Sequence, residues 1–141
     1  MSLRYFAALA VGVSAITLSS CGSPEQEVPA DPEGVAGLTV ENARMVLPAV
    51  SGNPAAVYFD LAYDGDANPT LAAVAVEGSD IAMLHGYGAK DFKVQMIEME
   101  PLKLTKGAAI AFEPGGRHVM ARNVSPELSA GGKTEVTLIR D

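Results

Sequence analysis

The feature that most restricts the fold is a series of turn-forming clusters that divide the chain into short apolar segments. Glycine, proline, asparagine and aspartate gather at residues 51–54, 64–69, 114–116 and 131–132. No segment between them shows a long helical repeat of apolar residues. Short apolar segments separated by turn clusters are typical of an all-β sandwich or barrel.

Apolar and polar residues alternate within these segments, as expected for half-buried strands. In the second segment Val57, Phe59 and Leu61 should face the core, whereas Tyr58 and Asp60 should face outward. Residues 103–107 are expected to form a short loop or an edge strand. The expected strands are 38–47, 56–63, 70–77, 81–86, 92–99, 108–112, 117–124 and 134–139.

Histidines and methionines are concentrated in one part of the chain. Both histidines, His85 and His118, and four of the six methionines lie between residues 83 and 120. Ten residues separate His85 from Met96, twenty-one separate Met96 from His118, and one separates His118 from Met120. Because His118 and Met120 are two residues apart, they point to the same face of a strand. The other two side chains would come from neighbouring strands.

Imidazole and thioether groups form a soft ligand set. Such groups suit Cu(I) better than the oxygen-preferring ions Mg²⁺ and Ca²⁺, and two histidines with two methionines would complete a four-coordinate site. Each residue also has a simpler interpretation. Methionine commonly fills gaps in a core, and a lone histidine is usually a hydrogen-bonded core or surface residue. The spacing of the four residues together favours the metal site.

At these positions the sequence resembles the periplasmic copper chaperones of the PCu(A)C family. The family signature is His, ten residues, Met, twenty-one residues, then His-x-Met, which fits His85, Met96, His118 and Met120. Residues 112–120, Phe-Glu-Pro-Gly-Gly-Arg-His-Val-Met, also resemble the family's proline-glycine-glycine turn and the strand that follows it. The resemblance covers roughly residues 36–141.

The sequence departs from the family pattern beside the first histidine, at Leu84 and Gly86. Neither departure removes a ligand. The resemblance implies a cupredoxin-like Greek-key β-sandwich that binds one Cu(I) ion through the four residues. The sequence leaves open whether Met83 or Met99 replaces a ligand, and what the affinity and the oligomeric state are.

The resemblance also implies a periplasmic metallochaperone with a copper-accepting protein as its partner. That partner would be the copper centre of a haem-copper (cytochrome c) oxidase, reached directly or through a Sco-type protein. A turn at 114–116 just before His118 would place the site at a loop end of the sandwich, which favours transfer. The alternative is a surface lipoprotein that stores copper, or that has a structural role without transfer.

The first residues have the layout of a secretory leader. Arg4 precedes an apolar stretch at residues 5–18, which is shorter than the roughly 20 apolar residues of a membrane-spanning helix. The sequence Leu-Ser-Ser-Cys at 18–21 then resembles a bacterial lipobox. We therefore expect residues 1–20 to be a lipoprotein signal peptide and Cys21 to carry a lipid. The alternative is ordinary signal cleavage that leaves Cys21 as a free thiol.

A short linker is expected between the lipid and the folded domain. Residues 21–37 are rich in Pro, Glu and Gly and poor in large apolar groups, so they cannot bury enough surface to offset the entropy of ordering. The domain would then span residues 38–141 on the periplasmic side of the membrane. Gly22, where a retention signal would have Asp, favours the outer membrane by the same resemblance.

The composition excludes several classes of function. A net charge of −7 without a basic patch argues against nucleic acid as a partner. Cys21 is the single cysteine, so the domain cannot build a blue-copper centre, which needs a thiolate ligand. No activated nucleophile or acid–base pair stands out, so an enzyme is not expected. Residues 64–68 match a calcium loop only faintly, because its distal glutamate is missing.

Overall fold

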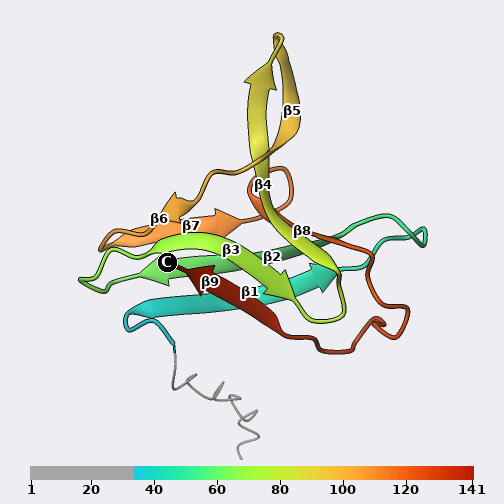
Figure 1. The fold of residues 1–141 in the computed structure, drawn as a ribbon, viewed down its shortest axis with the longest axis horizontal. Coiled ribbons are helices and arrows are strands. Elements are labelled where there is room, and N and C mark those ends of the chain that lie inside the picture. The colour runs from blue at the N-terminus through green and yellow to red at the C-terminus, as the bar shows by residue number, and fades with distance from the viewer. Residues whose placement is uncertain (1–33) are drawn as a thin grey trace, which may run out of the picture. The chain divides into compact units, whose positions relative to one another are not determined.

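The computed structural model describes residues 34–141, and the expected signal peptide, Cys21 and residues 21–33 of the expected linker lie outside the described residues. Every regular element in 34–141 is a β-strand (Figure 1), so the prediction of an all-β fold is confirmed. The strands are β1 (Leu38–Val46), β2 (Ala55–Tyr63), β3 (Thr70–Val76), β4 (Ile81–Lys90), β5 (Lys93–Glu98), β6 (Leu102–Lys103), β7 (Ala108–Phe112), β8 (His118–Arg122) and β9 (Val136–Arg140).

Across residues 34–141, no helix is long and apolar enough to cross a membrane.

The strands form two antiparallel sheets. The larger sheet has the order β1-β2-β8-β4-β5, with β7 also paired to β2, and the smaller sheet has the order β6-β3-β9. The chain crosses between the sheets repeatedly, for example from β2 to β3 and back to β4 (Figure 1). This arrangement agrees with the expected β-sandwich.

One apolar core lies between the sheets, and β2 shows how the sequence builds it. Val57, Phe59 and Leu61 are at most 2% exposed, whereas Asp60 is exposed, so the expected alternation is confirmed. Phe59 stacks on Phe112 of β7 with ring centroids 4.3 Å apart. Burial of each such side chain contributes roughly 1.5–3 kcal/mol. The core therefore holds the central strands of the larger sheet firmly in place.

Strands β7 and β8 pair with the same edge of β2, one after the other. Phe112 lies opposite Phe59, and Val119 lies opposite Val57. Val57 and Phe59 are thus two residues apart on β2, whereas their partners Val119 and Phe112 are seven residues apart along the chain. The surplus residues, 113–117, leave the sheet as a loop and return to it at the start of β8.

The hairpin of β4 and β5 is longer than expected, because β4 continues to Lys90 instead of ending near residue 86. It projects from the sandwich (Figure 1). Lys90 and Lys93 pair across a two-residue loop of Asp91 and Phe92, whose φ angles are 53° and 60°. Loops of this left-handed type match the twist of a hairpin. The outer part is exposed on both faces, so the alternation that marks a half-buried strand is missing there.

The remaining strands begin and end within two residues of the expected bounds. In the region 103–107, where a loop or an edge strand was expected, only the end of the short strand β6 is present. These small differences do not change which residues face the core.

Candidate functional site

The four residues predicted as ligands share the outward face of the larger sheet. His85 of β4 lies directly opposite His118 of β8, and Met120 follows on the same strand. Met96 of β5 lies opposite Tyr87, two residues beyond His85 on β4. Residues directly opposite each other in antiparallel strands project to the same face. Strand register therefore brings all four side chains to one surface.

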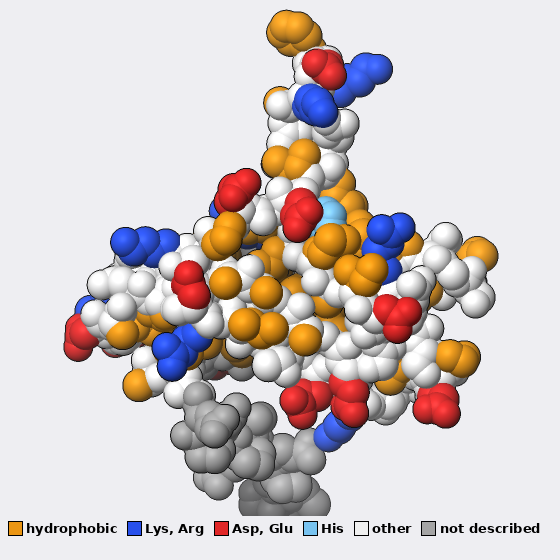
Figure 2. All heavy atoms as spheres, in the orientation of Figure 1, with side chains coloured by type: hydrophobic (Ala, Val, Ile, Leu, Met, Phe, Trp, Pro, Cys, Tyr) orange, Lys and Arg blue, Asp and Glu red, His pale blue; other side chains and the backbone are white. Residues whose placement is uncertain are grey.

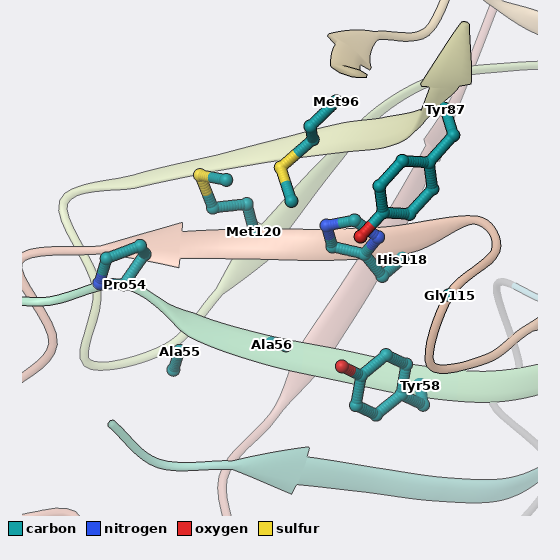
Figure 3. Close-up of a pocket in the computed structure, with 9 residues that line it drawn as sticks. All are labelled: Pro54, Ala55, Ala56, Tyr58, Tyr87, Met96, Gly115, His118 and Met120. Atoms are coloured by element: carbon teal, nitrogen blue, oxygen red, sulfur yellow. The ribbon is translucent and has the colours of Figure 1, made fainter. Parts of the chain in front are cut away.

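A surface pocket of about 170 Å³ opens on this face (Figure 3). Met96, His118 and Met120 line it. Figure 3 shows the two methionine sulfur atoms on the same side of β8 as the imidazole of His118. His85 is not among the lining residues, but its ring lies beside that of His118, with centroids 5.9 Å apart and planes inclined by 21°.

Each histidine ring is oriented by the carbonyl group two residues before it. The Nδ1–H of His118 donates to the carbonyl oxygen of Gly116 at 3.1 Å, and that of His85 donates to the carbonyl oxygen of Met83 at 3.4 Å. A carbonyl oxygen can only accept, so these contacts place the proton of the neutral imidazole on Nδ1, and in that neutral form Nε2 keeps its lone pair. Metal-binding histidines are commonly oriented in this way.

The loop 113–117 supplies the carbonyl that orients His118 and part of the pocket wall. Gly115 lines the pocket with φ of +80°, a backbone conformation that glycine adopts readily. The N–H of Gly116 donates to the carbonyl oxygen of Glu113 at 3.0 Å and closes the turn. The turn lies beside the site, as expected, but the site itself is on the face of the sheet and not at a loop end of the sandwich.

Aromatic rings surround His118, which is only 6% exposed. The ring centroids of Tyr58 and Tyr87 lie 6.3 Å and 6.1 Å from that of His118. The guanidinium carbon of Arg44 lies 5.1 Å from the Tyr58 ring centroid and covers that ring. Met96 is much more open, at 42% exposure. The site thus combines a shielded imidazole with an accessible thioether.

The sequence interpretation missed the two tyrosines. Tyr87 follows His85 by two residues, so strand alternation would have placed it on the same face if β4 had been expected to extend that far. Tyr58 comes from β2, and it reaches His118 only because β2 pairs with β8. No local signal in the sequence shows that pairing.

The sequence left open whether Met83 or Met99 replaces a ligand, and the structure places these two methionines differently. Met83 lies directly opposite Met120, on the face that carries the site. Met99 packs against the core on the inner face, where a Cβ atom added at Gly86 would lie 3.4 Å from its sulfur. Met83 is therefore in a position to take part in the site, and Met99 is not.

The site is poor in hard ligands. Glu98 lies directly opposite His85 and places a carboxylate at the margin of this face. In the described part of the chain, no three side chains of His, Cys, Asp or Glu gather closely enough to hold a metal ion. A metal bound on this face would therefore rely on methionine sulfur, which oxygen-preferring ions do not favour.

Comparisons with known proteins support the family resemblance that was seen in the sequence. The family described as "Putative lipoprotein LpqE-like" matches residues 38–140. No match to a curated protein sequence is found.

Two solved structures are similar over most of the domain. The "Apo PCuAC domain from PmoF1" is 30% identical with a TM-score of 0.62, and the alignment covers 77% of this chain and 86% of that one. The "Copper-bound PCuAC domain from PmoF2" is 18% identical with a TM-score of 0.61, covers 77% of this chain and 85% of that one, and shows likeness of fold. The chain therefore belongs to the LpqE-like family, and its folded part is a PCu(A)C domain with a cupredoxin-like β fold.

Proposed function

We propose that His85, Met96, His118 and Met120 bind one Cu(I) ion and that the protein is a copper chaperone. The observation that carries the proposal is the register of β4, β5 and β8, which places two imidazoles and two thioethers on one face. Both imidazoles use Nδ1 for a backbone carbonyl, which would leave Nε2 of the neutral ring for a metal. Thioether and imidazole groups suit Cu(I), and a copper-bound PCuAC domain shares the fold.

The unequal exposure of the ligands favours transfer over storage. Met96 is 42% exposed, whereas His118 is 6% exposed. An incoming ligand from another protein could therefore reach an ion beside Met96, while His118 still holds it from the other side. A storage site would be better served by ligands shielded on every side. The proposed partner is a copper-accepting protein, either an oxidase subunit or a Sco-type chaperone.

We also propose that the protein is lipid-anchored in the periplasm through Cys21, with the outer membrane as the favoured location. The lipobox-like sequence at 18–21 and the lipoprotein description of the family support this proposal. The linker at 21–37 would give the domain the reach to meet a partner. Cys21→Ser should release the protein from the membrane or leave the signal uncleaved, with Cu(I) affinity unchanged. A loss of affinity in this variant would mean that Cys21 is a ligand.

Titration with Cu(I) in the presence of a competing chelator tests the site. We expect one tightly bound Cu(I) per chain and a strong loss of affinity in His118→Ala and Met120→Ala. Met99→Leu is the matched control, because this thioether faces the core and should not affect binding. Tight binding of a second equivalent, or equal affinity in all variants, would contradict the proposed site.

A transfer assay separates the chaperone from a storage protein. The Cu(I)-loaded protein is mixed with the apo form of a candidate acceptor, and the copper content of both is measured after their separation. Movement of copper to an acceptor of comparable affinity supports transfer. Copper that stays in place, even when the acceptor binds it more tightly, indicates storage.

A further inference from the structure

Apart from Met96, which lines the pocket, the outer part of the β4–β5 hairpin belongs neither to the core nor to the pocket wall. It projects from the sandwich (Figure 1), and every residue from 89 to 98 is exposed. A two-stranded hairpin without further support is only marginally stable in water. Its composition therefore reflects a requirement other than packing within the domain.

Phe92 occupies the tip of the hairpin and is fully exposed, at 109% of the reference area. Its φ of +60° lies in the left-handed region, where glycine and asparagine are favoured and phenylalanine is strained. Neither turn geometry nor packing explains a phenylalanine at this position. Figure 2 shows apolar, basic and acidic side chains together at the far end of the hairpin.

One face of the hairpin is apolar along its length. Tyr87 is paired with Met96, and Ala89 is paired with Val94, so these four side chains lie on the same face. Val94 is 77% exposed and Tyr87 is 47% exposed. The apolar face thus runs from the tip of the hairpin towards the sandwich.

The tip also carries two lysines directly opposite each other, Lys90 and Lys93. Like charges in this position destabilise a hairpin. Neither lysine forms an ion pair within residues 34–141, where the salt bridge present joins Lys106 to Asp66. Asp91 lies between Lys90 and Phe92 in the loop, so the two lysines and this carboxylate together leave the tip with a net charge of +1 beside an exposed phenylalanine.

We propose that the tip of the β4–β5 hairpin docks on an anionic lipid bilayer. Phe92 would enter the interface between headgroups and acyl chains, and Lys90 and Lys93 would contact lipid phosphates. Lysines next to a membrane are attracted by its negative surface potential. The whole chain has a net charge of −7, so the same surface would repel the acidic remainder and orient the domain with its tip towards the lipid.

This docking would leave the pocket accessible. Met96 lies four residues from Phe92, which corresponds to about 13 Å along an extended strand. The pocket would then stand above the headgroups, in water.

A protein partner would need a cavity for a convex tip with paired lysines, whereas a bilayer offers many phosphates and a deformable apolar interior, so the observations favour lipid. The inference does not depend on copper binding.

A single tryptophan at the tip tests the proposal, because the protein has none of its own. The full chain with Phe92→Trp is mixed with vesicles of phosphatidylcholine and phosphatidylglycerol. We expect the emission maximum to move to shorter wavelength and brominated lipids to quench it. Val50→Trp, at a 63% exposed position outside the hairpin, is the control and should stay unshifted even if another part of the chain binds the vesicle.

The charge requirement is tested in the same background. Lys90→Gln together with Lys93→Gln should weaken partitioning of the tip by roughly 25-fold, since each lysine contributes about a fivefold factor at an anionic surface. Vesicles of phosphatidylcholine alone should cause little shift. An unshifted emission from position 92, an equal shift from position 50, or an equal response to neutral vesicles would each overturn the proposal.

Discussion

The sandwich body and the β4–β5 hairpin differ in how deeply their residues are buried. Strands β2 and β8 run through the middle of the larger sheet, and Val57 and Val119 are at most 1% exposed. The outer part of the hairpin, in contrast, has no buried residue from 89 to 98. The candidate site draws on both regions, because His118 and Met120 come from the body and Met96 comes from the hairpin.

This difference points to a division of tasks between the proposed ligands. His118 is surrounded by aromatic rings and tied to the carbonyl of Gly116, so its position is set before a metal arrives. Met96 sits on an element with few buried contacts, and such elements open at low free-energy cost. The body would keep the ion in place, and the hairpin would allow it to be exchanged.

Amide hydrogen exchange should show the largest contrast between the two regions. Amides in the core of β2 should exchange only through global unfolding, which typically requires about 5–15 kcal/mol. Amides of residues 93–96 need only local opening and should exchange many times faster. The measurement is exchange followed by NMR or mass spectrometry. Equal protection in both strands would show that the hairpin is as well supported as the body.

Truncation of an aromatic ring should have a large effect in the body and almost none at the hairpin tip. Phe112→Ala removes a buried ring stacked on Phe59 and should lower the free energy of unfolding by about 3–5 kcal/mol. Phe92→Ala at the exposed tip should change it by no more than about 0.5 kcal/mol. Denaturant unfolding of both variants gives the comparison. A large loss in Phe92→Ala would mean that the tip packs against the domain.

The two methionines proposed as ligands should contribute unequally to Cu(I) affinity. Ordering a free methionine side chain costs up to about 1.5–2 kcal/mol of conformational entropy. Met96 is more exposed than Met120, so its side chain has more freedom to lose when a metal binds. Met96→Leu should therefore reduce affinity about tenfold less than Met120→Leu. Competition with a chelator measures both. A larger loss in Met96→Leu would place the firmer ligand on the hairpin.

The smallest effect is expected from relief of backbone strain at the tip. Phe92 has φ of +60°, and this left-handed conformation costs an L-residue about 1–2 kcal/mol. Glycine removes the strain, but its greater flexibility in the unfolded chain offsets part of the gain in stability. Phe92→Gly should therefore raise the free energy of unfolding by less than about 1 kcal/mol. Ala89→Gly, where φ is not positive, should lower it by about 0.5–1 kcal/mol. Destabilisation in both variants would argue against strain at Phe92.

Local features of the sequence were enough to predict most of the strand bounds, the turns and the four residues proposed as ligands. The alternation of Val57, Phe59 and Leu61 predicts their burial, because strand side chains alternate between faces. The proline-glycine-glycine turn before His118 follows from backbone preferences of these residue types. The spacing of histidines and methionines singled out four residues that the structure brings to one face.

Strand register decided everything that depends on contacts between distant residues. It places Tyr58 beside His118, puts Met83 and Met99 on opposite faces, and extends the hairpin that carries Met96 to a basic tip. A slip of one residue would move a whole strand's side chains to the other face, yet it leaves the local pattern of turns and strands unchanged. Pairing is selected by the packing of the whole core, so only the tertiary structure determines it.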